Sequence, residues 1–151
     1  SDLTQDWKND PVARGPKKNR NEFRTTSALR GLFLSSAGVD PKDPAWGTVA
    51  LTAAAITTGT HRTSWLNEGW GTPLLDFWDD FSDDGALDPR PGGGEDMPFG
   101  SLTVETEVPA AGSAAVTFLL TWHFPNRRTW TPKNDDEDLI ENFYTTRWPD
   151  S

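Results

Sequence analysis

The sequence predicts an all-β protein: an antiparallel β-sandwich, part of a larger sandwich, with one short inserted helix. The main evidence is the stretch Ala114–Trp130, in which apolar residues occupy every second position from Val116 to Phe124. This period of two is typical of a strand with one buried face. Several other short apolar segments are separated by turn-forming Pro, Gly and Asp residues, as in sandwiches. Only Thr72–Asp80 changes to a helical period.

Composition and charge limit the function. The 151 residues suit one domain, and eight Trp and eight Phe offset a hydrophobic fraction of only 34%. A net charge of −9 disfavours nucleic acid or an anionic membrane surface as a partner. The absence of Cys excludes disulfides and thiolate metal sites.

Targeting and cofactor signals are also missing from the sequence. No apolar run approaches the ~18–20 residues of a membrane helix. The opening SDLTQDWKND has neither the basic nor the apolar part of a signal peptide, and the compartment remains open. Walker and GxGxxG patterns do not occur, so we expect no cofactor.

The first strands follow a polar beginning. Residues 1–29 lack periodicity and contain turn residues, so we expect an irregular lead-in before a domain over residues 30–151. Gly31–Ser36 reads as a short strand, and the prolines of Gly38–Pro44 make a turn. Thr48–Thr57 is apolar on both faces; its alanines permit a helix, but its β-branched residues favour a buried strand.

A hairpin is expected next. Thr60–Leu66 would pair with Thr48–Thr57 across Thr58–Gly59. His61 then occupies a partly exposed cross-strand position rather than a ligand position. Further along, Ser101–Val108 alternates cleanly and would form a second hairpin with the central strand, through a turn at Pro109–Ser113.

The segment Thr72–Asp80 predicts the helix. Thr72 can cap it and Pro73 suits its first turn. Apolar side chains recur at the spacing of one helix face, which we expect to pack on the sheet: Leu74, Phe77, Trp78 and Phe81.

The acidic end of this helix raises two chemical possibilities. Asp80, Ser82, Asp84 and Gly85 match the first positions of a calcium loop, but Pro91 stands where a bidentate Glu is required. Asp80 and Asp84 are therefore weak calcium candidates, and a solvated turn with Gly85 ending the helix is the competing interpretation. The adjacent Asp pairs also lack an apolar pocket that would make one a catalytic acid.

The chain ends in three further segments. Pro125 has no N–H for a ladder and should end the central strand. Pro132–Asp138 reads as an acidic loop, and Asn142–Trp148 as a strand or extended segment.

Taken together, several strings resemble the N-terminal domain of glycoside hydrolase family 116, which contains β-glucosidases and the non-lysosomal (bile-acid) glucosylceramidase. The resemblance covers nearly the whole chain from Asn19, in the order of the family. The strings are NRNEFR, RGLFLSSAGVDPKDPAWGTVALT, FWDDFSDDGAL, FGSLTV, FLLTWHFPNRRTW and NFYTTRW.

The resemblance implies a large β-sandwich packed on an (α/α)6 catalytic domain. Such enzymes retain configuration and use two carboxylates, a nucleophile and a general acid/base. Both belong to the catalytic domain, beyond the counterpart of NFYTTRW. We therefore expect this chain to be a fragment of a glycosidase, without its first sandwich strands and without catalytic residues, and inactive alone. Whether the parent acts on a glucoside or on glucosylceramide stays open.

For the residues present, we expect a surface that docks on the absent catalytic domain near its active-site rim. Arginines can pair with acids across such an interface, and tryptophan is a large anchor. The interface or substrate-rim candidates follow the central strand or lie on the helix: His123, Asn126, Arg127, Arg128, Trp130, Phe77 and Trp78. A hydrogen-bonded structural role for His123, core packing for Trp122 and Phe124, and an idle surface arginine pair are the competing interpretations.

Two other classes of function stay open. A free-standing carbohydrate-binding module could stack sugars on tryptophans outside the buried stripes: Trp46, Trp65, Trp70, Trp130 and Trp148. A purely structural half-sandwich would contact no sugar. Exposed, coplanar tryptophans would favour the module. A truncated sandwich should expose open strand edges and an apolar patch, and completion of such an edge by a second copy stays an open alternative.

Overall fold

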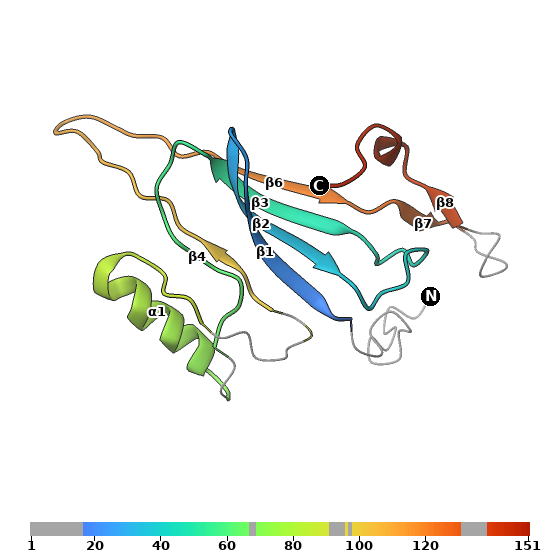
Figure 1. Ribbon diagram of the computed structural model, residues 1–151, viewed down its shortest axis with the longest axis horizontal. Helices are drawn as coiled ribbons and strands as arrows, with labels where there is room; N and C mark the ends of the chain where they lie inside the picture. Colours follow the sequence, from blue (N-terminus) through green and yellow to red (C-terminus); the bar gives the residue numbers. More distant parts are fainter. Residues whose placement is uncertain (1–16, 67–68, 91–95, 97, 131–138) are drawn as a thin grey trace.

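The protein is described by a computed structural model that covers residues 17–66, 69–90, 96, 98–130 and 139–151 (Figure 1). It is an antiparallel β protein with one inserted α-helix, which confirms the predicted fold class. The described elements are β1 Asn19–Thr25, β2 Leu29–Ser36, β3 Thr48–Ala54, β4 His61–Arg62, α1 Thr72–Asp84, β5 Ser101–Leu102, β6 Phe118–His123, β7 Asn126–Arg128, β8 Leu139–Glu141 and the 3₁₀ helix η2 Phe143–Thr146.

The centre of the molecule is a four-stranded antiparallel sheet in the order β1-β2-β3-β6. The expectation of irregular chain before residue 30 is wrong for Asn19–Thr25, which pairs with β2 along its whole length. Phe23 is the one large apolar side chain of this strand. The other positions are polar, so the strand lacks the alternation of apolar and polar residues by which it could be predicted. The predicted lead-in over residues 1–16 and the predicted acidic loop Pro132–Asp138 lie outside the described residues.

One face of this sheet, here called the Leu32 face, is half covered. Its register aligns Phe23, Leu32, Leu51 and Leu120 across the four strands. Over β1 and β2 lies the small β4–β5 ladder, whose His61 ring stacks on Phe23 at 3.8 Å between centroids. Leu32 is only 1% exposed beneath it. The core therefore sits between β1–β2 and β4–β5.

Both predicted hairpins are wrong. β4 pairs with β5, not with β3, and β3 lies between β2 and β6. The physical reason lies at Arg30, whose guanidinium donates to the carbonyls of Thr57 and Gly59 and turns the chain away from β3. The backbone N–H of Thr103 and of Glu105 then extend the β4–β5 pairing along Thr60 and Thr58.

The predicted buried stripe of β6 is also wrong. Phe118, Leu120 and Trp122 are 47%, 61% and 59% exposed, whereas His123 on the other face is 6% exposed. The alternation is real, but no described element packs over this half of the Leu32 face. Alternation in sequence predicts which side chains share a face and leaves open whether that face is covered.

Helix α1 extends to Asp84, beyond the predicted end at Asp80. Its N-cap is Gly71 rather than Thr72, and Gly85 in the left-handed conformation ends it by donating its N–H to the Phe81 carbonyl, as expected for a C-terminal glycine. The predicted apolar stripe divides: Phe77 stacks on Trp65 at 4.7 Å between ring centroids, while Trp78 is 61% exposed.

The chain beyond Pro125 forms a separate small ladder. β7 pairs with β8, and the 3₁₀ helix η2 follows where a strand or extended segment was predicted over Asn142–Trp148. The Tyr144 hydroxyl ties η2 back to the end of β6, since it contacts both the N–H and the carbonyl of Phe124. In Figure 1 this ladder and α1 lie at opposite ends of the long axis.

Candidate functional site

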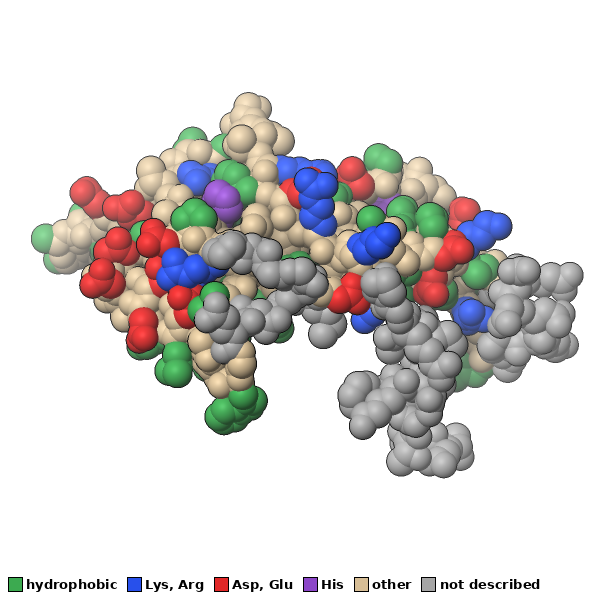
Figure 2. All heavy atoms as spheres, turned by 60° about the horizontal axis from the view of Figure 1, so that its bottom comes forward, with side chains coloured by type: hydrophobic (Ala, Val, Ile, Leu, Met, Phe, Trp, Pro, Cys, Tyr) green, Lys and Arg blue, Asp and Glu red, His purple; other side chains and the backbone are tan. Residues whose placement is uncertain are grey.

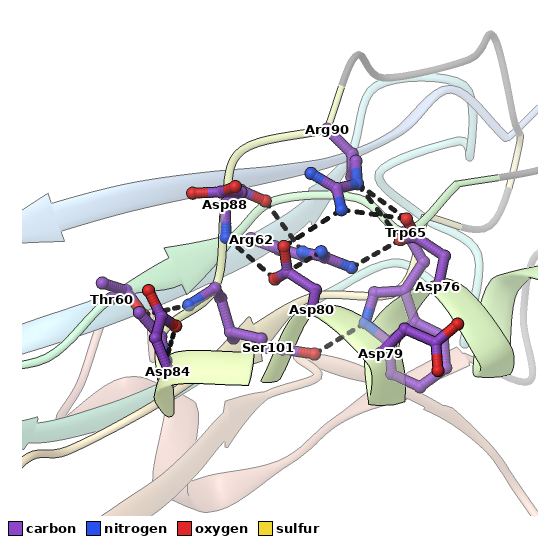
Figure 3. A network of polar contacts seen from close by, with 12 residues as sticks. Thr60, Arg62, Trp65, Asp76, Asp79, Asp80, Asp84, Asp88, Arg90 and Ser101 are labelled. Atoms are coloured by element: carbon purple, nitrogen blue, oxygen red, sulfur yellow. Dashed lines mark hydrogen bonds and ion pairs between the residues drawn. The ribbon is translucent and has the colours of Figure 1, made fainter. Parts of the chain in front are cut away.

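Four charged side chains meet between α1 and the β4–β5 ladder, and we call them the arginine–aspartate cluster (Figure 3): Arg62, Asp76, Asp80 and Arg90. Asp76 and Asp80 are one helical turn apart, so both carboxylates leave the same face of α1. Arg62 comes from β4, and Arg90 from the chain that returns after the helix.

The contacts of the cluster are short and reciprocal. Arg62 Nη1 donates to Asp76 Oδ2 at 2.8 Å, and its Nη2 lies 2.6 Å from Asp80 Oδ2, an ion contact outside hydrogen-bond geometry. Arg90 Nε donates to both oxygens of Asp76, at 2.9 and 3.1 Å, and its Nη2 donates to Asp80 Oδ1 at 3.0 Å. Each carboxylate is thus shared between two guanidinium groups.

The charged groups of the cluster are buried, so their contacts replace those that water would make. The Arg62 side chain is 0% exposed and that of Asp80 is 9% exposed, so both charges are largely removed from water. Arg62 Nε also donates to the Asp88 carbonyl at 2.8 Å. A buried guanidinium is costly unless its charge is matched. The two carboxylates match the charge of Arg62, and its Nε and Nη1 are hydrogen-bonded, whereas Nη2 makes only the ion contact with Asp80.

The environment of Asp80 favours its charged form. Burial by itself would raise the pKa of this carboxyl, but the hydrogen bond from the Asp88 N–H and the charges of Arg62 and Arg90 together hold its pKa below the usual value. For Arg90, burial acts to lower the pKa, and Asp76 and Asp80 outweigh it and raise the pKa. The surroundings of Asp80 and of Arg90 therefore both favour the charged form of the side chain.

The cluster is suited to holding α1 in place. A catalytic acid needs a raised pKa, and the pKa of Asp80 moves the other way. Asp80 is engaged by two arginines, and Asp84, the other calcium candidate, accepts the Ala86 N–H at 2.8 Å. Within the described residues no group of three or more His, Cys, Asp or Glu side chains could hold a metal ion.

Sequence reasoning missed Arg62, Asp76 and Arg90. The spacing of Asp76 and Asp80 is a visible signal, because residues four apart share a helix face. Nothing local in the sequence connects this face with Arg62, which lies in a different element. The neighbouring Asp79 takes no part in the cluster, since its carboxylate points away from the arginines in Figure 3.

The residues predicted at the exit of the central strand lie on and around β7. Asn126 is not free for a partner: its amide donates to the carbonyls of Pro41 and Asp43 and so fixes the 38–44 turn against β7. Arg127 and Arg128 are exposed, and Trp130 is 99% exposed. The neighbouring 3₁₀ helix adds Phe143, which is 75% exposed and lies under the Arg147 guanidinium at 5.5 Å.

His123 is separate from this surface. It is 6% exposed and packs edge-to-face on Tyr144, with ring centroids 6.3 Å apart. Its Nε2 has no hydrogen-bond partner among the described residues. His123 is therefore buried against Tyr144, but the hydrogen bond expected of a structural histidine is not made at Nε2 with a described residue.

The structure does not bring all predicted site residues together. Phe77 is half-buried in the aromatic contacts of α1, and Trp78 faces outward on that helix, at the end of the molecule opposite β7. Acidic side chains gather at the α1 end in Figure 2. The α1 end and the β7 end are therefore two surfaces of different character.

The tryptophans proposed as a sugar platform also divide. Trp70, Trp130 and Trp148 are 102%, 99% and 58% exposed. Trp46 is half-buried, and Trp65 lies in the interior of the α1 contacts, where its Nε1–H donates to Ser101 Oγ at 2.6 Å. Trp65 is thus a packing residue.

The part of the chain that the structure describes is thus an antiparallel β domain with one inserted helix, in which the neighbouring carboxylates of Asp76 and Asp80 are paired with arginines. The chain matches over residues 4–151 the family model described as beta-glucosidase 2, glycosyl-hydrolase family 116 N-term. It therefore belongs to the N-terminal domain family of glycoside hydrolase family 116, as the sequence resemblance indicated. No curated protein matches it in the comparison with such proteins. None of the described helices has the length and apolar character needed to cross a bilayer.

Proposed function

We propose that this chain is the non-catalytic β-domain portion of a family 116 glycoside hydrolase and packs against an (α/α)6 catalytic domain, whose active-site side it shapes. The observation that carries the proposal is the β7 end, where Arg127 is exposed, Trp130 is 99% exposed and the following helix η2 adds Phe143, which is 75% exposed. Exposed Trp and Arg are the side chains that most often dominate protein interfaces.

The chemistry of this chain supports a non-catalytic role. Retaining hydrolysis needs two carboxylates, one of them with a raised pKa. The carboxylates that lie close together here, Asp76 and Asp80, are each paired with two arginines. On this proposal the nucleophile and the acid/base both belong to the catalytic domain, which binds the glucoside or glucosylceramide substrate.

The test uses the enzyme that carries this domain together with its catalytic domain. Trp130→Ala should lower the thermal midpoint of the catalytic domain, and raise KM for p-nitrophenyl β-glucoside, because a large interface anchor is lost. Trp70→Ala is the matched control, since Trp70 is equally exposed but lies beside α1. Equal behaviour of the two variants would refute the β7 end as the docking surface. Turnover by the 151 residues alone would refute the non-catalytic role.

A carbohydrate-binding module is the second candidate, and the exposure of Trp70, Trp130 and Trp148 favours it. A flat indole can stack on the C–H face of a pyranose. Titration of the chain with cello-oligosaccharides, followed by tryptophan fluorescence, separates the two functions. Saturable binding that Trp130→Ala abolishes would support the module, whereas the docking proposal expects none.

A further inference from the structure

The short strand β4 lies between α1 and the central sheet, and its two residues contact one layer each (Figure 1). Successive side chains of a strand point to opposite sides. Arg62 points toward α1, where it forms ion pairs with the helix carboxylates. The His61 ring packs on the sheet, where it stacks on Phe23 with 3.8 Å between centroids and 10° between the ring planes. His61 is therefore part of the contact that holds the β4–β5 ladder on the sheet.

The ladder covers the most buried side chain of the Leu32 face through few contacts. Leu32 is 1% exposed and is directly opposite Phe23 in the register of β1 and β2. β4 and β5 are two residues long each. Besides the stack, the side-chain amide of Asn21 ties the ladder to β1, because it donates to the carbonyls of Thr63 and Pro98 at 3.0 and 2.8 Å. A weakened stack would thus loosen the cover over Leu32.

A permanent positive charge lies beside the stack. The guanidinium of Arg30 on β2 is 5.5 Å from the centroid of the same Phe23 ring. It is fixed there by two hydrogen bonds, each 2.9 Å long, to the carbonyls of Thr57 and Gly59. Both acceptors are uncharged, so they do not neutralise the guanidinium. A protonated His61 would bring a second positive charge to a ring that already has one cation beside it.

No carboxylate of the described residues offsets such a charge from the sheet side. Glu22, the acidic residue of β1, lies next to Phe23 in sequence and so points to the other face of the sheet. There it is paired with two arginines of the same strand. On β2 the charged residue that acts on His61 is Arg30.

The ladder side supplies no counter-charge among the described residues either. The residue opposite His61 on β5 is the apolar Leu102. Glu105 is exposed, three positions further along that segment, and Asp96 accepts a backbone N–H ahead of β1. The carboxylates of α1 lie on the other side of β4, where Arg62 and a second arginine bind them.

These surroundings favour the neutral imidazole. Burial, the larger cause, and the charge of Arg30 both lower the pKa of His61 from its ordinary value. An aromatic ring face attracts a cation, but here the imidazolium would share that attraction with the guanidinium beside it. The folded ladder therefore holds His61 in its neutral form at pH 7.

We propose that the β4–β5 ladder is an acid-sensitive cover of Leu32, which loosens when His61 takes up a proton. In the loosened state the ring is in water and binds a proton at its ordinary pKa of about 6.5. The stabilising contribution of the stack is thus fully present above that pH and is lost as the pH falls through the lower folded value. The central sheet has its own backbone ladder and stays folded. This inference does not rest on the proposed docking to a catalytic domain.

Amide hydrogen exchange of the 151-residue chain between pH 7 and 5 tests the opening. The N–H groups of Thr103 and Glu105 donate to the carbonyls of Thr60 and Thr58 and so report on the ladder. Their protection factors should fall with pH, by at most about tenfold for each pH unit because one proton is taken up. The amides of β3, which is paired on both sides, should keep their protection.

Two variants assign the effect to the histidine. His61→Phe keeps an aromatic ring on Phe23 but cannot take up a proton, so the pH dependence of ladder protection should disappear. His123→Phe is the matched control, because the chain contains two histidines, and it should retain that dependence. Titration of the imidazole C–H resonances by NMR, assigned with these two variants, should place the pKa of His61 below its ordinary value. His61→Gln serves if His61→Phe does not fold.

Three results would overturn the proposal. His61 could titrate at or above its ordinary pKa, which the unsubstituted chain alone decides. The ladder amides could respond to pH equally with and without His61. Protection of β3 could fall together with that of the ladder, which would mean that acid unfolds the whole domain rather than its cover.

Discussion

The two ends of this domain use arginine in opposite ways. At the α1 end, the Arg62 side chain is fully buried and forms ion pairs with Asp76 and Asp80 inside the molecule. At the β7 end, the Arg127 side chain is exposed and makes no hydrogen bond or ion pair with a described residue, and Trp130 two residues after β7 is 99% exposed. The difference arises from the neighbouring groups. Two carboxylates one helical turn apart face Arg62, whereas solvent faces Arg127. A buried, matched charge fixes structure, whereas an exposed one is available to a partner.

The largest expected effect is the loss of the buried charge at the α1 end. Arg62→Met leaves Asp76 and Asp80 close together with only Arg90 to balance them. Removal of one side of a buried ion cluster typically costs about 3–5 kcal/mol. Urea unfolding followed by tryptophan fluorescence measures this.

Arg127→Met at the β7 end is the matched control and should change the free energy of unfolding by less than about 0.5 kcal/mol. If the two variants were equally stable, the arginine–aspartate cluster would not hold α1, and the contrast between the two ends would fail.

Local signals in the sequence predicted the elements better than their partners. Alternation identified the strand at Phe118–His123, and Gly85 identified the end of the helix, because both depend on neighbouring residues. The pairing of β4 with β5 depends on Arg30 reaching Thr57 and Gly59, a contact between distant residues that no short pattern records.

The candidate site was predictable to a similar extent. The exposed Trp130 and Arg127 were identified from their position after Pro125, a strand terminator. The arginine–aspartate cluster was not, because half of it lies on α1 and its buried partner Arg62 lies on another element. Exposure of Trp122 was missed for a different reason: a sequence period gives the face of a residue but not what covers that face.

Acidification should affect the α1 end selectively. Because the pKa of Asp80 is lowered in the folded state, its stabilising contribution is present above the unfolded pKa of about 4 and is lost as the pH falls through the folded value. Asp80→Asn should cost about 2–3 kcal/mol at pH 7, since hydrogen bonds to a charged group are lost. Its stability should then fall less steeply than that of the unsubstituted protein below about pH 5.

Urea midpoints between pH 3 and 7 measure this difference. The pKa of Glu22 is also lowered, first by its hydrogen bond with Arg24, but this residue is retained in both proteins and cancels in the comparison. Parallel pH profiles would show that Asp80 does not contribute charge-dependent stability.

The smallest effect separates local from tertiary stabilisation of α1. Gly85 has φ 78°, in the left-handed region that a side chain disfavours, and its N–H caps the helix at the Phe81 carbonyl. Gly85→Ala should therefore cost about 1 kcal/mol, compared with Ser82→Ala as an exposed control within the helix. Amide hydrogen exchange along α1 gives the site of the effect, which should be confined to the last turn. If Gly85→Ala destabilised the protein more than Asp80→Asn, the cap rather than the buried ions would anchor α1. The buried ion pairs would then no longer distinguish the α1 end from the β7 end, and the two ends would differ mainly in the side chains that they expose.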